Sequence, residues 1–366
     1  MKARRIGWVI ALVLLMSLMG CRSDGTPPGQ GRFTQTANQD AQTGGPSFID
    51  AHNHLVGFNR PGKDYLTAAR VALKKMDQLG ILKMVIMPPP RVPDQPGSFD
   101  VSDLIPVVKR YPNRFACLGG GGTLNVMIHE NKTRRTIGAD TKRKFEKMAL
   151  NILSRGAIGF GELSVEHFSL NWDHPYESAP ADHPLFLMLA DLAARHHVPL
   201  DIHMEAIPQD MPLPKRNLLL RSGRNPAMLH ENLSAFERLL DHNREAKIIW
   251  AHVGWCNTGY RTPALCRKLL QKHPNLFMTI KLSPESVPAT RILTKDQKSI
   301  KPAWLTLFQD YPDRFLIGTD QFYVPPGSRR IGPQKTSTTR QLMNLLPPGL
   351  ARKIGIENPR HVLNLK

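Results

Sequence analysis

The strongest constraint on the fold is a repeating rhythm of short apolar runs and helical patterns that begins at residue 47. In the segment 64–78, Leu66, Ala69 and Leu73 recur at the spacing of one helix face. The predicted strands are 47–54, 82–87, 115–118, 157–163, 199–203, 247–252, 276–282 and 315–320. The predicted helices are 64–78, 102–110, 140–154, 184–196, 231–242, 263–272, 301–310, 338–346 and 349–364. Strands that alternate with helices pair in parallel, so we expect an α/β fold, a (β/α)8 TIM barrel.

An open, doubly wound sheet is the alternative arrangement for the same alternation of strands and helices. That fold binds dinucleotides through a glycine fingerprint with a fixed spacing. The glycine run Gly119–Gly122 lacks the spacing, and no linker interrupts the count of strands. The pattern therefore favours a single barrel domain over residues 47–366.

The residues before the barrel have a different character. Positive charges within residues 2–5 precede an apolar stretch, 6–16, that is too short to span a membrane. We predict that residues 1–20 are a signal peptide. Residues 21–46 are rich in Gly, Gln, Thr and Pro and predict a flexible tether.

The run Leu18-Met19-Gly20-Cys21 resembles the cleavage box of a bacterial lipoprotein. The resemblance implies cleavage before Cys21, whose thiol and new amino group then carry lipid that anchors the chain to a membrane. Arg22 follows, rather than Asp, which by the bacterial sorting pattern favours the outer membrane facing the periplasm. The alternative is an ordinary secretory signal followed by a chance cysteine.

Three further cysteines, Cys117, Cys256 and Cys266, remain if Cys21 is lipidated, and an odd number cannot pair completely. Cys117 stands in an apolar run and is expected to be a buried thiol. Cys256 and Cys266 could form a disulfide in an oxidising compartment, or stay free.

The chain is strongly basic, with a formal net charge of +19. Such charge could attract anionic substrates, a membrane surface or nucleic acid. No nucleic-acid motif or interleaved aromatic residue accompanies the basic clusters at 132–135 and 142–144. We therefore expect no nucleic-acid partner, and solvated helix faces and loops explain most of the charge.

Residues with metal-binding chemistry stand where the predicted strands end, which is where a (β/α)8 barrel builds its active site. The first strand ends in His52 and His54, and residues two apart on a strand point the same way. Two such imidazoles form a chelating pair for a borderline metal such as zinc. The other strand-end residues of this kind are Glu162, His203, His252 and Asp320. Each alone has an ordinary explanation, but their common depth in the barrel predicts one metal site.

In combination these residues resemble the amidohydrolase superfamily, which carries His-x-His, Glu, His, His and Asp in this order over strands one, four, five, six and eight. The segments 48–55, 250–254 and 318–322 resemble most its amidohydrolase-related branch. The tail 357–363 resembles the closing segment of that branch, so the resemblance covers residues 47–365. It implies a metal-dependent TIM-barrel enzyme.

Carried over residue by residue, the resemblance makes His52, His54 and Asp320 ligands of one metal. His203 and His252 match positions that bind a second metal in binuclear members. In mononuclear members the strand-five histidine binds the single metal, and the strand-six histidine acts on the substrate.

Glu162 matches the position of a carboxylate that bridges the two metals of binuclear members. Glu166, four residues on, is a weaker candidate for the same role. The resemblance implies a divalent cation, with zinc expected and two ions favoured over one.

The chemistry implied is hydrolysis of an ester, lactone, amide or phosphoester bond by a hydroxide that the metal generates from water. Asp320 is expected to move the proton from the water to the leaving group, with His252 as a second catalytic residue. Non-oxidative decarboxylation with one metal is the first alternative. A non-catalytic binding lipoprotein is the second, although none of the six matching positions is lost.

The substrate is expected to be a small molecule, and basic residues near the site point to an anionic one. Lys281 ends the seventh predicted strand, and Arg221 and Arg224 lie in a loop that would overhang the site. Such side chains bind carboxylate or phosphate groups, although ordinary surface arginines are the simpler explanation for the loop. Barrels of this branch are often dimers, so a homodimer stays open.

Overall fold

The computed structural model describes residues 44–57, 64–95, 99–170, 174–214, 222–283, 286–328 and 336–366. The predicted signal peptide, Cys21 with its predicted lipid, most of the predicted tether and Arg221 lie outside these residues, so what the sequence indicates about them stays a prediction. Within the described part of the chain, no helix is long and apolar enough to cross a membrane.

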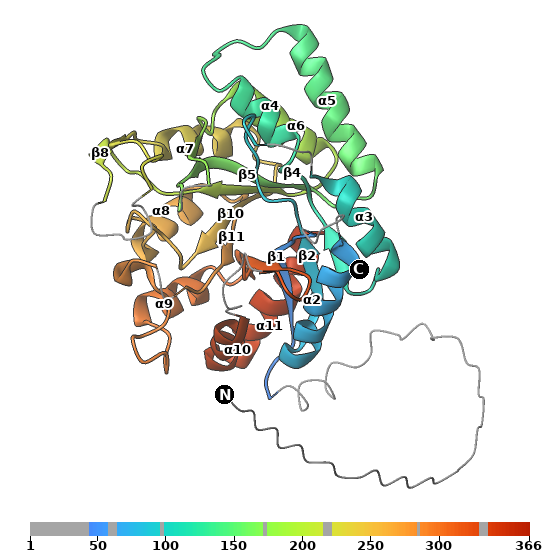
Figure 1. The fold of residues 1–366 in the computed structure, drawn as a ribbon. Coiled ribbons are helices and arrows are strands. Elements are labelled where there is room, and N and C mark those ends of the chain that lie inside the picture. The colour runs from blue at the N-terminus through green and yellow to red at the C-terminus, as the bar shows by residue number, and fades with distance from the viewer. Residues whose placement is uncertain are drawn as a thin grey trace, which may run out of the picture. The chain divides into compact units, whose positions relative to one another are not determined.

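Parallel strands form the centre of the fold, with helices outside them (Figure 1). The central strands are β1 (Phe48–Leu55), β2 (Ile81–Ile86), β3 (Phe115–Cys117), β4 (Gly119–Gly120), β5 (Phe160–His167), β7 (Leu200–Met204), β10 (Ile248–Val253), β11 (Leu276–Ile280), β12 (Phe315–Ile317) and β13 (Gln321–Tyr323). They pair in the orders β13-β1-β2-β3 and β12-β11-β10-β7-β5-β4. Leu118 alone separates β3 from β4, and residues 318–320 separate β12 from β13, so each couple acts as one strand. The pairing thus runs round a ring of eight strands, and the expected α/β barrel is confirmed.

The helices follow the strands in alternation. They are α2 (Tyr65–Leu79), α3 (Val101–Arg110), α4 (Leu124–Glu130), α5 (Ala139–Ser154), α6 (Pro184–Arg195), α7 (Leu233–His242), α8 (Pro263–Lys272), α9 (Pro302–Asp310), α10 (Thr336–Leu345), α11 (Pro348–Arg352) and α12 (Asn358–Val362). Local signals explain their ends: Asp100 forms a capping box at the start of α3, and Gly80 ends α2 with a left-handed φ of 66°.

Three differences from the expected elements have local causes. The two-turn helix α4 was not expected, because seven residues are too few to show helical periodicity. β5 begins later than expected and runs on to His167, because its end pairs antiparallel with β6 (Glu177–Ser178). The C-terminal helix is interrupted by a π-helical turn, Lys353–Glu357. The Asn358 amide then donates to the carbonyls of Pro312 and Phe315 and ties α12 to the eighth strand.

Apolar side chains form two layers, as a barrel requires. An inner cluster fills the ring of strands, and the last residues of α12 join it. Its members are Ala51, Val85, Met87, Ala116, Leu118, Ile249, Phe277, Leu316, Val362 and Leu363. A larger cluster packs the outer faces of the strands against the helices, with Phe48, Phe160, Trp250 and Trp304 among its members. The strands bury both faces, which is why their sequences read as continuous apolar runs.

The short strands β8 (Met211–Pro212) and β9 (Met228–Leu229) form a separate antiparallel pair beyond the ring. They belong to the segment that follows β7. The sequence predicted this segment as a loop overhanging the site.

Glu166 lies on the extension of β5. The Tyr176 hydroxyl donates to its carboxylate at 2.6 Å. Burial, reinforced by the carboxylate of Glu205, raises the pKa of Glu166 to about 7 despite this hydrogen bond. Glu166 belongs to none of the groups of described side chains that could hold a metal, so its weaker candidacy as a bridge stays a prediction.

The raised pKa of Glu166 makes stability depend on pH. The folded protein holds the Glu166 proton more tightly than the unfolded chain does. Its contribution to the free energy of unfolding is therefore fully present below about pH 4.5 and is lost as the pH rises towards 7. We expect the free energy of unfolding of the natural protein, relative to Glu166→Gln, to fall by about 2–3 kcal/mol between pH 5 and pH 8. Urea unfolding at both pH values measures it, with the exposed Glu245→Gln as control. If the natural protein and Glu166→Gln differ in free energy of unfolding by the same amount at both pH values, Glu166 is not a buried, protonated carboxyl.

The glycine run before α4 serves close backbone approach. A Cβ atom on Gly121 would lie 2.4 Å from the Pro88 carbonyl oxygen, and one on Gly122 would lie 1.6 Å from that of Phe99. Neither contact is sterically possible, so only glycine fits between these segments.

Replacement of Gly122 by alanine should therefore force backbone to move and lower the free energy of unfolding by about 2 kcal/mol or more. Gly349→Ala is the matched control, because a Cβ atom there meets nothing within 4 Å. Chemical denaturation of both variants checks the prediction, and equal stability would show that Gly122 is not closely packed.

Candidate metal centre

The structure brings together all the residues that the strand ends predicted as metal ligands. They are His52, His54, Glu162, His203, His252 and Asp320. Their potential ligand atoms form three overlapping groups, each within 4.8 Å. These groups are His52 with His54 and Glu162, His52 with His252 and Asp320, and Glu162 with His203 and His252. Among the described residues, no other group of this kind occurs.

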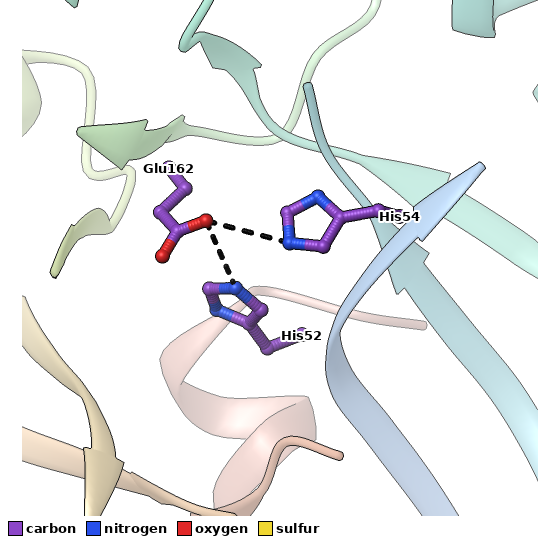
Figure 2. A group of neighbouring side chains, drawn as sticks. All are labelled: His52, His54 and Glu162. Carbon is purple, nitrogen blue, oxygen red and sulfur yellow. Dashed lines mark ion pairs between the residues drawn. The ribbon is translucent and has the colours of Figure 1, made fainter. Parts of the chain in front are cut away.

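Glu162 lies at the middle of the cluster and is 3 % exposed. Its Oε2 atom is 3.5 Å from Nε2 of His52 and 3.4 Å from Nε2 of His54 (Figure 2). Its Oε1 atom lies 2.8 Å from Nδ1 of His203 and 3.1 Å from Nε2 of His252. Each carboxylate oxygen therefore faces its own pair of histidines.

Asp320 closes the cluster on the side of the eighth strand. Its Oδ1 atom is 3.1 Å from Nε2 of His54, and its Oδ2 atom is 3.9 Å from Nε2 of His252. Its carboxylate also pairs with the ammonium of Lys281. Asp320 thus touches both pairs of histidines and a cation from the end of β11.

The other ring nitrogens of the first pair show which nitrogen is free for a metal. Nδ1 of His54 lies 2.9 Å from the Met87 carbonyl oxygen, which can only accept a hydrogen bond. Nδ1 of His52 lies 3.3 Å from the carboxylate of Asp201. Burial lowers the pKa of both histidines, but the neighbouring carboxylates outweigh burial and raise it above its usual range. A cation would displace the Nε2 protons and leave the Nε2 atoms, which face Glu162, as lone-pair donors.

The residues fit a divalent cation. The Nε2 atoms of His52 and His54 are buried and have no hydrogen-bond partner of good geometry. Imidazole nitrogens together with carboxylate oxygens are ligands that zinc and similar ions prefer. The cluster also holds the buried carboxylates of Glu162 and Asp201 and the partly exposed one of Asp320, and Lys281 pairs with Asp320 alone, so added positive charge is electrostatically favoured.

Irregular strand pairing aims these side chains inward. The pairing of β1 with β2 shifts between Asp50 and Asn53. Ala51 belongs to the inner cluster, whereas Leu55, four residues on, belongs to the outer one. The strand therefore changes face at the bulge, which directs His52 and His54 towards the interior.

Similar shifts in strand pairing occur on two more strands. The pairing of β5 with β7 shifts between Phe160 and Leu163, around Glu162. The pairing of β10 with β11 shifts between Trp250 and Val253, around His252. β7 alone keeps regular alternation at this level, which places Asp201 and His203 on one face.

Two of the six residues have backbones in the left-handed region that favours glycine. The φ angles are 73° for His252 and 50° for Asp320. Hydrogen bonds hold both: the His252 amide donates to Thr279 Oγ1, and the Asp320 amide donates to the His52 carbonyl. Non-glycine residues in this region are uncommon and gather at functional sites.

Charges within the cluster set the protonation of its carboxylates. Burial raises the pKa of Glu162, but attraction to His52 and hydrogen bonds from His203 and His252 outweigh burial and hold the pKa well below its usual range. Burial likewise raises the pKa of Asp320, but Lys281 and the histidines hold it well below its usual range. Both carboxylates are therefore ionised at neutral pH and available as ligands or as a base.

Three neighbours of the cluster were not predicted from the sequence. Asp201 stands two residues before His203, so strand alternation could have identified it. The ring of Trp255 meets His203 and His252 edge-on, with centroids 5.9 Å and 5.8 Å away. The His167 ring lies 4.1 Å from that of His203. Neither Trp255 nor His167 had a readable signal, because each follows a strand irregularity.

The predicted substrate residues have different surroundings. The Lys281 ammonium lies 3.7 Å from the centre of the Trp255 ring in addition to its contact with Asp320. Arg224 is exposed on the loop that follows β7, so its assignment stays a prediction. Cys256 and Cys266 are both buried free thiols, as is Cys117.

The sequence model of a family described as amidohydrolase matches residues 49–365. No curated protein matches the chain in sequence. Similar solved structures include 2,6-dihydroxybenzoate decarboxylase from Rhizobium, 14 % identical, with 87 % of this chain and 99 % of that chain covered and a TM-score of 0.47.

Two other similar structures cover 87 % of this chain. 4-Oxalomesaconate hydratase from Rhodopseudomonas palustris is 14 % identical, with 96 % of its chain covered and a TM-score of 0.48. Dihydroorotase from Campylobacter jejuni is 15 % identical, with 84 % of its chain covered and a TM-score of 0.47. At these identities and TM-scores they bear on neither substrate nor reaction. The family match spans the whole barrel and all six clustered residues, and the chain belongs to the amidohydrolase family of metal-dependent enzymes.

Proposed function

We propose that the protein is a hydrolase that uses divalent cations to cleave an ester, lactone, amide or phosphoester bond of a small anionic substrate. The observation that carries the proposal is the position of Glu162, whose two carboxylate oxygens each face a separate pair of histidines. This arrangement suits a carboxylate that links two cations. The imidazole and carboxylate ligands favour zinc.

The ligands divide into two sets in this proposal. His52, His54 and Asp320 would hold one cation, His203 and His252 would hold the other, and Glu162 would be shared between them. When bound, such cations supply Lewis acidity, which lowers the pKa of water and polarises a substrate oxygen.

Asp320 is proposed as the general base and acid. Its side chain is 11 % exposed, more than the other carboxylates of the cluster, so water and substrate reach it most easily. Its low pKa keeps it ionised, so its oxygens carry no proton before the reaction begins. Its Oδ2 atom faces His252, whose pKa burial holds well below its usual range. A neutral His252 would offer a ring nitrogen to the second cation; with a single cation it would instead be free to orient Asp320 or the substrate.

Lys281 is proposed to bind the anionic group of the substrate. Its ammonium lies between the Asp320 carboxylate and the face of Trp255, so it stands beside the proposed base. An ammonium in a partly buried position attracts carboxylate or phosphate strongly because little water screens it.

The proposal is tested by metal analysis of the purified protein, followed by a screen of lactones, esters, amides and phosphoesters. About two zinc ions per chain and water-consuming cleavage are expected. About one metal with release of CO₂ from a carboxylate substrate would instead indicate a decarboxylase. Metal with no turnover of any class would indicate a binding protein.

The role of Asp320 is tested by Asp320→Asn, which removes the base but keeps the shape and one ligand oxygen. We expect turnover to fall by about 10²–10⁴-fold, the range of a general base, with most of the metal retained. Hydrolysis rates and metal content measure the two effects. Asp313→Asn, at an exposed position paired with Lys353, is the control. A fully active Asp320→Asn would remove Asp320 from the mechanism.

The role of Lys281 is tested with a pair of esters, one carrying a carboxylate and one neutral but of the same size. Lys281→Met should lower kcat/KM for the anionic ester about 10-fold more than for the neutral one. The ratio cancels any indirect effect through Asp320. Arg155→Met, at an exposed position after α5, serves as the control for general loss of positive charge. Equal losses for both esters would rule out the anion-binding role.

A further inference from the structure

Arg261 is a buried cation close to the metal centre, in the loop between β10 and α8. It is 1 % exposed. Among the described residues, no carboxylate lies within ion-pair distance of it; its guanidinium donates instead to the main-chain carbonyls of Met204 and Ala251. Burial of an unpaired charge is strongly unfavourable, so these carbonyl contacts must matter to the fold around them.

The two carbonyls mark the place where pairing of β7 with β10 ends. The last paired residues are Ile202 and Trp250. Met204 follows His203 directly, and Ala251 directly precedes His252. The left-handed φ of 73° at His252 turns the backbone out of the strand geometry that further pairing would need. The Arg261 side chain therefore joins the strands where backbone hydrogen bonds cannot.

Trp250 holds the guanidinium in place. The Arg261 Cζ atom lies 4.4 Å from the centre of the Trp250 ring. The indole Nε1 atom donates to the Met204 carbonyl at 2.8 Å, so this oxygen accepts from both side chains. A planar guanidinium over an indole ring presents two donors in a fixed geometry, which a lysine ammonium cannot reproduce.

We propose that Arg261 is a positioning residue for the second pair of histidines. By bridging the carbonyls beside His203 and His252, it sets the separation at which Nδ1 of one and Nε2 of the other both meet Oε1 of Glu162. The inference rests on the proposed function, in which this pair holds the second cation.

The test is a zinc titration of the metal-free full-length protein against a chromophoric chelator. The natural protein should show two binding steps, and His203→Ala identifies the step that belongs to the second pair. Arg261→Met should weaken that step about 10–100-fold, the range for loss of a group that orients a ligand, and leave the other within about threefold. Arg261→Lys should weaken it similarly, because it keeps the charge but not the bridge.

The matched control is Arg267→Met on α8, whose guanidinium pairs with Asp310 at the surface at 2.6 Å. Both steps should match those of the natural protein. Thermal unfolding of each metal-free variant separates lost folding from lost positioning. If Arg261→Met does not fold, the folded Arg261→Lys variant decides.

Two results would overturn the positioning role: unchanged zinc steps in the folded Arg261 variants, or equal weakening of both steps. A natural protein with a single zinc step would contradict the two-cation part of the proposed function. In that case the zinc affinity of the single step is compared between the natural protein and the Arg261 variants. An unchanged affinity in both variants would overturn the role of Arg261.

Discussion

The rest of the structure depends on one buried charge, the carboxylate of Glu162. An ionised carboxylate without partners would destabilise a protein interior by several kcal/mol. Four imidazoles from three other strands surround it, and they share it two to each oxygen. The fold needs the imidazoles as partners for this carboxylate. The same carboxylate and imidazoles make the pocket suited to cations, so one arrangement of side chains serves both stability and chemistry.

The strands accommodate this charge by departing from regular geometry. Regular alternation would carry the inner apolar layer up to the rim of the barrel. Instead, the strand pairing shifts at His52, Glu162 and His252, and the apolar side chains of the barrel interior are replaced there by the clustered histidines and carboxylates. Nearby hydrogen bonds stabilise the departures: Asp50, fully buried, accepts from both the amide and the hydroxyl of Thr319, just before Asp320. Strain at the centre is thus offset by contacts one residue away.

A second layer of polar side chains surrounds the ligands. Asp201 and the Met87 carbonyl orient the first pair of histidines, and in our proposal Arg261 spaces the second pair. Lys281 faces Asp320 from the remaining side. In our proposal, side chains held in this way would be oriented before a cation binds, so less conformational freedom would be lost on binding.

The sequence by itself determined the barrel and the candidate ligand residues, because both are periodic signals: apolar runs spaced by helices, and polar residues where those runs stop. His-x-His works at this level since residues two apart share a strand face whichever way the strand turns. Only the tertiary structure decided which face that is, because the bulges in β1, β5 and β10 arise from pairing between distant strands. For the same reason Trp255, Arg261 and the contact of Lys281 with Asp320 could not be predicted. Trp255 and Arg261 depend on where the loop beyond the bulge in β10 returns, and the Lys281 contact depends on two strand ends that are distant in sequence. No local spacing encodes either.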